Sequence, residues 1–269
     1  MRRDTAWPKA ADPDAASRLL ERFTETGDCE AALAASCAGR AMLEALGGGS
    51  PFLSDLALRE HAVAVQVMRD GPDAALEQVA SDLAAIGPGM ARAPLAAALR
   101  QAKRRVALIT AMADIGGRWS LARVTGTLSW LAETTLRHAV DHLLHAAHQA
   151  RELSLPDPAH PGPGSGLVVL GMGKLGAGEL NYSSDIDLVL LYDPEAYPGH
   201  DGLGAVFTRL ARNLVAIMEA RDADGYVFRT DLRLRPDPAA TPPVVALPAA
   251  LAYYESMGQN WERAAMTKA

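Results

Sequence analysis

The segment from Leu167 to Asp193, LVVLGMGKLGAGELNYSSDIDLVLLYD, constrains the fold of this chain more than any other part of it. An apolar run of strand type leads into a glycine-rich turn that carries Lys174, and a second strand follows in which Asp185 and Asp187 stand two residues apart. Alternate side chains of a strand point to the same side, so both carboxylates are expected on one face. Two carboxylates on one face of an otherwise apolar strand suit hard divalent cations that hold phosphate groups. The segment therefore indicates phosphoryl or nucleotidyl chemistry.

A third acidic residue lies in the stretch RTDLRLR, residues 229–235, within a strand predicted over 226–235. Alternation places Asp231 on the same face as Arg229, Arg233 and Arg235, and the leucines on the other. If this strand pairs near 185–191, three carboxylates and several guanidinium groups converge, and two divalent ions can bridge the acids and a phosphate. A solvated strand face of alternating charge is the alternative, but it does not explain the glycine-lysine turn upstream.

Gly171, Gly173 and Gly176 match the GxGxxG pattern of dinucleotide-binding turns. That interpretation requires a helix that opens inside the turn, and the residues that follow, AGELNYSS, are too few and too turn-like for one. Gly173-Lys174-Leu175 does not fit a phosphate loop either, because such a loop needs Ser or Thr after the lysine. The glycines therefore predict a turn and no dinucleotide fold.

Four histidines follow one another at spacings of four, three and three within a predicted helix, so they form one stripe: His138, His142, His145 and His148. A pair at i and i+4 can bind zinc, but no HExxH pattern or nearby cysteine accompanies it. The favoured interpretation is a polar helix face that lines a domain contact.

Composition limits the class of protein. Only 5% of the chain is aromatic against 49% hydrophobic residues, which favours helix, and the net charge of -6 argues against a nucleic-acid partner. Cys29 and Cys37 indicate neither a disulfide framework nor a metal knuckle. The start MRRDTAWPKAADPD lacks the apolar segment of a secretory signal, and no run approaches the roughly 18 apolar residues of a membrane span. We expect no membrane partner and a cytoplasmic location.

The chain is predicted to have three parts: a helical N-terminal region over 1–152, a Pro/Gly-rich linker over 153–166, and a catalytic core over 167–269. Ser50 and Ser120 are expected to cap helices, and another helix is predicted over 94–115. The core is predicted to contain strands at 167–171, 185–192 and 226–235, a helix at about 203–221 and another near Pro248. This order indicates an α+β class, a small mixed sheet with helices against one face.

Four motifs closely resemble the family of bifunctional glutamine synthetase adenylyltransferase/adenylyl-removing enzymes: GMGKLGAGELNYSSDIDLVLLYD, FRTDLRLRPD, YYESMGQNWERAAMTKA and GGGSPFLSDLALR. The resemblance covers essentially the whole chain. It implies a mainly helical N-terminal region followed by a nucleotidyltransferase mixed sheet related to that of DNA polymerase β. There a glycine-containing turn precedes the DxD strand, and a later strand carries the third acid.

The resemblance also implies an activity. The family has two such catalytic domains in tandem: one attaches AMP from ATP to a tyrosine of glutamine synthetase, and the other removes it by phosphorolysis, with phosphate attacking and ADP leaving. The removing domain is the N-terminal one, and a chain with Met1, a long helical lead-in and a single DxD motif is similar to that half. The chain ends shortly after WERAAM, where the family continues, so we expect a truncated chain.

By the same resemblance, Asp185, Asp187 and Asp231 are implied to ligate Mg²⁺, with two ions and with Mn²⁺ as an option. Phosphate or nucleotide contacts are implied for Gly173, Lys174, Ser183 and Ser184, while Arg233 and Arg235 are candidates from strand geometry. The implied partners are glutamine synthetase and the PII signal protein, in the regulation of nitrogen assimilation. Two alternatives stay open: ATP-dependent adenylyl transfer in the forward direction, and an inactive docking or regulatory module.

Overall fold

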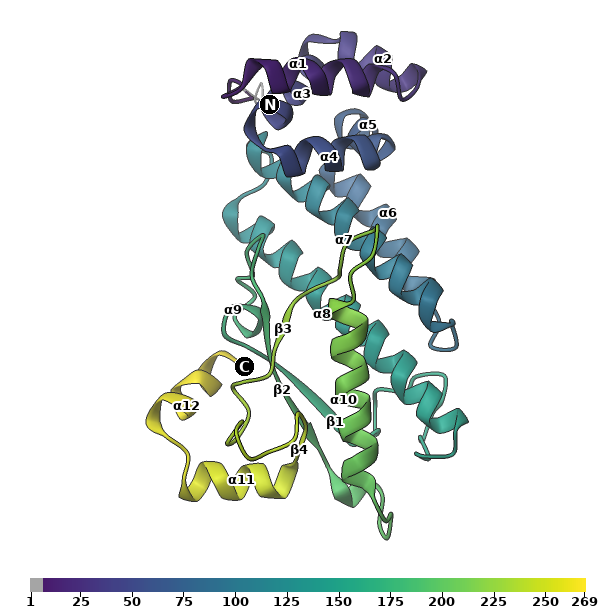
Figure 1. Ribbon diagram of the computed structural model, residues 1–269, viewed down its shortest axis with the longest axis vertical. Coiled ribbons are helices and arrows are strands. Elements are labelled where there is room, and N and C mark those ends of the chain that lie inside the picture. The colour runs from purple at the N-terminus through teal and green to yellow at the C-terminus, as the bar shows by residue number, and fades with distance from the viewer. Residues whose placement is uncertain (1–6) are drawn as a thin grey trace. The chain divides into compact units, whose positions relative to one another are not determined.

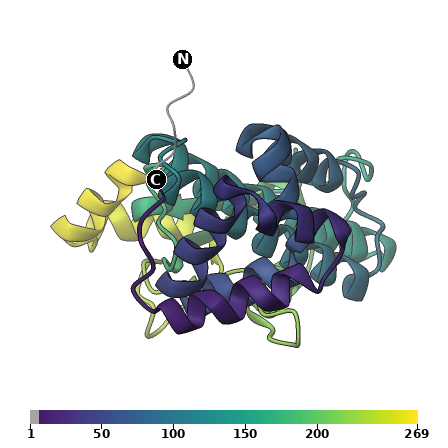
Figure 2. The ribbon, with the colours of Figure 1, turned by 90° about the horizontal axis from the view of Figure 1, so that it is seen from above.

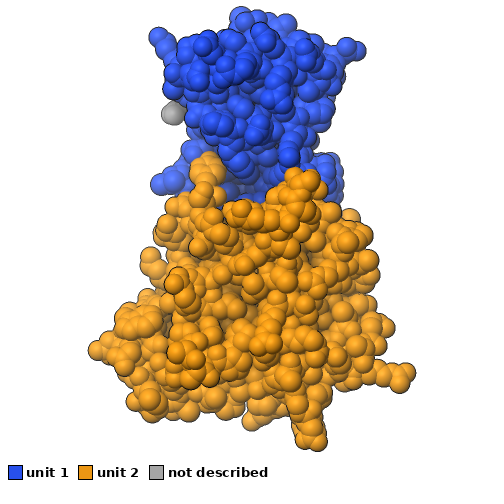
Figure 3. All heavy atoms as spheres, viewed as in Figure 1, with its two compact units in different colours: residues 1–83, 101–128 blue, residues 84–100, 129–269 orange. Residues whose placement is uncertain are grey.

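Helices precede a small mixed sheet in the computed structural model, which describes residues 7–269 (Figure 1). The predicted α+β class is therefore confirmed. Residues 1–6 carry the two arginines of the expected non-secretory start, and they lie outside the described residues. The described chain forms two compact units, the first within 1–83 and 101–128, the second within 84–100 and 129–269 (Figure 3). Residues 150–166 contain no helix or strand, and the proposed domain division there stays a prediction.

The N-terminal part is helical throughout, and its helices are α1 Pro13–Thr24, α2 Asp28–Ala35, α3 Cys37–Gly49, α4 Pro51–Arg59, α5 His61–Asp70, α6 Pro72–Ala84, α7 Arg92–Ile115 and α8 Leu121–Gln149. The predicted caps are confirmed: the Ser50 hydroxyl accepts from the Leu53 amide at 3.3 Å, and Ser120 accepts from the Arg123 amide at 3.3 Å. In the first unit α1 packs closely on α3 (Figure 2). Gly47 permits this approach, because a Cβ there would lie 2.9 Å from the Cβ of Leu19.

The sheet of the second unit is built around one central strand. It contains β1 Leu167–Met172, β2 Ile186–Tyr192, β3 Thr230–Asp231 and β4 Val245–Ala246. Strand β2 pairs with β1 antiparallel and with both β3 and β4 parallel. The other elements of this part are α9 Gly173–Gly176, η1 Pro194–Ala196, α10 Leu203–Glu219, α11 Leu247–Ser256, α12 Asn260–Ala265 and η2 Met266–Lys268. The predicted strands over 167–171 and 185–192 and the helix over 203–221 are thus confirmed to within about two residues.

Both faces of β2 are covered, whereas the sequence predicted helices on one face only. Leu190 lies with residues of α8 and α10, among them Leu144 and Leu210. On the opposite face Val189 and Leu191 form a buried cluster with Met172, Val245 and Ala250, against which Leu247 and Tyr254 of α11 pack. The C-terminal helices therefore supply a second layer that the strand-helix order did not reveal.

The third strand is much shorter than the predicted 226–235. The amides of Val227 and Phe228 both donate to the Met218 carbonyl at 3.0 Å, which ties this stretch to the end of α10 instead of to β2. After Asp231 the chain turns, because the Arg233 amide donates to the Asp231 carboxylate at 2.8 Å. Only Thr230 and Asp231 remain in the ladder, so the predicted alternation of side chains ends at Asp231.

Replacement of Leu188 by alanine tests how far the sheet core stabilises this part. Leu188 is 1% exposed, so Leu188→Ala is expected to lower the free energy of unfolding by about 2–5 kcal/mol. The control is Leu251→Ala in α11, where the side chain is 54% exposed and a change within about 0.5 kcal/mol is expected. Urea unfolding followed by circular dichroism measures both, and equal losses would contradict the assignment of β2 to the core.

Candidate active site

Two of the three predicted acids face each other across neighbouring strands. Asp187 of β2 is in register with Asp231 of the parallel strand β3, and in-register residues of neighbouring strands project to the same face. Asp185 immediately precedes β2 and is exposed, with 48% of its side chain accessible. The structure thus gathers the predicted acids at the N-terminal end of the central strand.

The electrostatics of the acids differ although they lie close together. Burial raises the pKa of Asp187, and the negative charges of Asp231 and Asp185 raise it further, while Arg233 acts in the opposite direction. Hydrogen bonding from Arg233 holds the pKa of Asp231 below its ordinary value. Asp187 is therefore the acid whose negative charge is least compensated by the protein itself.

Arg229 joins three groups around the first acid. Its Nε donates to Asp185 Oδ1, its Nη2 donates to the Ser183 carbonyl at 2.9 Å, and its Nη1 donates to the Tyr226 hydroxyl at 3.4 Å. Sequence reasoning placed Arg229 on the same strand face as Asp231 but did not count it among the site residues. The signal that was available is its position two residues before that acid in the motif RTD.

The glycine turn lies beside the middle acid. Gly173 has φ +59, and a Cβ there would lie 3.5 Å from Asp187 Oδ2, so glycine is suited both to the backbone and to the space next to the carboxylate. Instead of the predicted plain turn, Gly173–Gly176 forms a single helical turn, α9, on which Lys174 is exposed. The antiparallel pairing of β1 with β2 excludes a dinucleotide-binding βαβ unit here. Gly176 allows the backbone near the C-terminus to approach α9 closely, since a Cβ there would lie 2.0 Å from the Lys268 carbonyl oxygen.

The two serines before β2 lie close to the acids in sequence but differ in their contacts. Ser184 Oγ donates to the side-chain oxygen of Asn181, which closes the turn that precedes Asp185. Ser183 is exposed, and its carbonyl is the group that Arg229 binds. Hydroxyl contacts from either serine to a phosphate stay a prediction.

The two candidate arginines after β3 differ in what they bind. Arg233 is 84% exposed and binds the Asp231 carboxylate through Nε and Nη2. Arg235 instead donates to four backbone carbonyls of its own loop, those of Leu232, Pro238, Thr241 and Pro242. The expectation that Arg235 shares a face with Asp231 is wrong because the strand ends before it. All three nitrogen atoms of its guanidinium hold the 232–242 loop.

The acids fit a divalent cation by their donor chemistry. Among residues 7–269, no three carboxylate, imidazole or thiol groups lie in an arrangement ready to bind a metal ion, and arginines hold Asp185 and Asp231. The incompletely compensated charge of Asp187 and the space that Gly173 leaves beside it are the features that a cation would use. Asp187 and Asp231, which are in register, are the residues that would hold such a cation, with Asp185 next to them.

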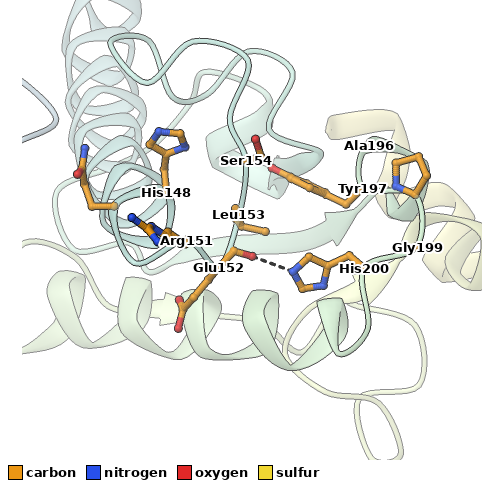
Figure 4. A pocket seen from close by; sticks show the side chains of 11 residues that line it. His148, Arg151, Glu152, Leu153, Ser154, Ala196, Tyr197, Gly199 and His200 are labelled. Carbon is orange, nitrogen blue, oxygen red and sulfur yellow. Dashed lines mark hydrogen bonds between the residues drawn. The ribbon is translucent and has the colours of Figure 1, made fainter.

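The histidine stripe of α8 binds backbone groups of the surrounding loops. The ring Nδ1 of His145 bonds to the Pro158 carbonyl at 3.1 Å, and His148 Nδ1 accepts from the Leu155 amide at 3.2 Å. His145 and His148 therefore anchor the segment that follows α8, in line with the favoured polar-face interpretation. A cleft of about 860 Å³ lies between the end of α8 and the loop after β2, where His200 Nε2 donates to the Glu152 carbonyl at 2.9 Å (Figure 4). The cleft lies beside the loop that follows the C-terminal end of β2, whereas the acids lie at the N-terminal end of β2.

Residues 41–269 match the glutamate-ammonia ligase adenylyltransferase family, and the chain belongs to it. It is similar to the bifunctional glutamine synthetase adenylyltransferase/adenylyl-removing enzyme of Rhizobium meliloti, with 45% identity over 96% of this chain and 27% of the relative. Relatives of the same name from Mesorhizobium japonicum and Agrobacterium fabrum are 46% and 43% identical, over 88% and 93% of this chain and 24% and 26% of their own. The chain thus spans about a quarter of the length of these relatives. None of the helices within residues 7–269 has the length and apolar character needed to cross a membrane.

The raised pKa of Asp187 predicts that the folded protein is more stable with a neutral side chain there. A carboxyl whose pKa is raised on folding adds stability at low pH, and this contribution is lost as the pH rises through the folded-state pKa. Asp187→Asn should therefore raise the free energy of unfolding at pH 7 by about 0.2–1 kcal/mol relative to the parent chain, without divalent ions present. Urea unfolding at pH 3 to 7 checks this, with the difference between the two proteins opening as the pH rises.

The matched control for this measurement is Asp185→Asn. Asp185 is exposed and paired with Arg229, so no comparable gain is expected. A gain of the same size in both variants, or in neither, would contradict the electrostatic difference between the two acids.

Replacement of Arg235 and of Arg233 compares the stability contributed by a guanidinium group fixed in its loop with that of an exposed one. Arg235→Gln removes donors to four carbonyls and is expected to cost about 1–3 kcal/mol of unfolding free energy. Arg233→Gln should cost much less, because that side chain is 84% exposed. Thermal or urea unfolding measures both variants. A stable Arg235→Gln protein with weakened phosphate binding would instead support the predicted phosphate contact.

Proposed function

We propose that this chain provides a nucleotidyltransferase site that removes AMP from the adenylylated tyrosine of glutamine synthetase by phosphorolysis, with release of ADP. The site would work as part of a bifunctional enzyme that also adenylylates glutamine synthetase from ATP. The observation that carries the proposal is the in-register pair Asp187–Asp231, with Asp185 immediately before the same strand. The names of the relatives include both activities.

The chemistry is a displacement at phosphorus. An oxygen of inorganic phosphate attacks the adenylyl phosphorus, the bond from that phosphorus to the tyrosine oxygen breaks, and the tyrosine hydroxyl is restored by a proton. Two Mg²⁺ ions, or Mn²⁺ ions in their place, would be held by Asp185, Asp187 and Asp231. When bound there, they would supply the positive charge that neutralises the reacting oxygens. The backbone at Gly173, the ammonium group of Lys174 and the hydroxyl groups of Ser183 and Ser184 would orient the phosphates.

The direction of reaction rests on the family resemblance. Helices α1 to α8 precede the sheet, as in the N-terminal, adenylyl-removing half of the family. The forward reaction from ATP uses the same acids and is the second candidate, and an inactive docking or regulatory module is the third. The cytoplasm as the place of action and the PII signal protein as a partner are further parts of the proposal that rest on the resemblance alone.

The test is to incubate the full chain with adenylylated glutamine synthetase, inorganic phosphate and Mg²⁺ and to measure ADP. Asp187→Asn should lower kcat/KM by about 10²–10³-fold, because charge stabilisation at the reacting phosphorus is lost. Arg209→Gln, which breaks an exposed ion pair with Glu152, should leave ADP release unchanged. The forward reaction would be favoured if the chain adenylylates unmodified glutamine synthetase from ATP but releases no ADP from adenylylated glutamine synthetase and phosphate. The absence of both reactions would favour the docking module.

A further inference from the structure

Two of the three acids are engaged by arginine side chains that reach into solvent. Arg229 binds Asp185 with 47% of its own side chain exposed, and Arg233 binds Asp231 with 84% exposed. Ion pairs whose guanidinium group is exposed stabilise a fold little, since water competes for that group, although the Asp231 side chain itself is only 17% exposed. The two guanidinium groups are therefore held at the acids but not locked there.

The middle acid, Asp187, is not neutralised by either arginine. Asp187 has no ion pair with an arginine in the described chain, and it lies in register with Asp231 on the neighbouring strand, two residues after Asp185. Negative charge in excess of the positive charge therefore remains between Asp185 and Asp231. Mg²⁺ commonly binds through one or two carboxylates, and each neighbour of Asp187 that could supply the second is paired with an arginine.

The contrast with Arg235 shows that exposure of the other two is not a general property of this segment. Arg235 donates from all three nitrogen atoms to backbone carbonyls and is fixed in its loop. Arg229 binds the Asp185 carboxylate through Nε, and Arg233 binds the Asp231 carboxylate through Nε and Nη2. Guanidinium N–H groups of this kind also match phosphate oxygens. Arg233 can exchange one anion for another without loss of a backbone contact. Arg229 also bonds to the Ser183 carbonyl and the Tyr226 hydroxyl through its Nη atoms, so the bond that it exchanges is the one from Nε to Asp185.

We propose that Arg229 and Arg233 are exchange arginines: each holds a carboxylate of the site until a divalent cation takes that carboxylate, and the freed guanidinium then binds the phosphate oxygens of the substrate. This inference rests on the proposed function, because it concerns the same acids. It makes cation binding and phosphate binding cooperative. The cation releases the arginines for phosphate, and phosphate keeps them from returning to the acids. Both guanidinium groups then contact the substrate phosphate directly.

The direct test observes the arginines themselves. In the full chain labelled with ¹⁵N-arginine, the Nε–H signals of Arg229, Arg233 and Arg209 are assigned by single replacement with glutamine. Titration with Mg²⁺ alone should shift the signals of Arg229 and Arg233 with one common saturation curve and leave that of Arg209 in place. Inorganic phosphate added next should shift the same two signals again, and it should do so only when Mg²⁺ is present.

Affinities provide the second readout. Arg229→Gln and Arg233→Gln should each bind Mg²⁺ roughly two- to fivefold more tightly by calorimetry, and phosphate in the presence of Mg²⁺ more weakly by a similar factor. Arg233→Lys separates occupancy of the carboxylate from long-range charge. It keeps the positive charge but loses the bidentate pair, so tighter Mg²⁺ binding is expected there too. Arg209→Gln, the matched exposed arginine with a carboxylate partner, should change neither affinity.

The outcomes separate this inference from the function on which it rests. Saturable Mg²⁺ binding that Asp187→Asn abolishes, with fixed signals for Arg229 and Arg233, would overturn the exchange and leave the proposed catalytic site intact. Equal Mg²⁺ affinity in Arg233→Lys and the parent chain would also overturn it, because charge alone would then account for the effect. Failure of Mg²⁺ to bind the parent chain would overturn both.

Discussion

The parallel register of β2 with β3 places Asp187 and Asp231 side by side, and much of the surrounding structure depends on this juxtaposition of two negative charges. Like charges opposite each other on neighbouring strands are unfavourable, so the register must be held by other interactions. Val189 and Leu191 hold it on β2, because a slip of one residue would move them out of the cluster against α11 and turn Asp187 into the opposite core. The apolar half of the strand thus determines where its acidic end lies.

Strand β3 has only two residues and depends on side chains for its position. Glu219, at the end of α10, accepts hydrogen bonds of 2.7 Å from both the amide and the hydroxyl of Thr230, immediately before Asp231. The buried Arg100 donates to the Ala220 carbonyl and pairs with Asp222 at 2.7 Å, which holds the chain as it leaves the helix. These contacts fix the third acid more firmly than a two-residue ladder would.

The elements that periodicity describes were predictable, and those that tertiary hydrogen bonds create were not. Apolar runs and helical spacing revealed the strands at 167–171 and 185–192 and the helix at 203–221 almost to the residue. The stretch 229–235 alternates like a strand, but the amides of Val227 and Phe228 bind the end of α10 and Arg235 binds its own loop, and no local pattern shows these partners. For the same reason the pairing of Arg229 with Asp185, across 44 positions of sequence, lay beyond sequence reasoning.

The acids themselves were predictable because they violate the local rules of a buried strand. A side chain such as asparagine at position 187 would suit the fold better, since it removes the repulsion that raises the pKa of Asp187. Such a conflict between local preference and global structure is expected at a functional site and is unfavourable elsewhere. The protein reduces the conflict with exposed guanidinium groups, which compensate the charge only partly. Incomplete compensation leaves an attraction for cations at the carboxylate that the glycine turn approaches, since a Cβ at Gly173 would lie 3.5 Å from Asp187 Oδ2.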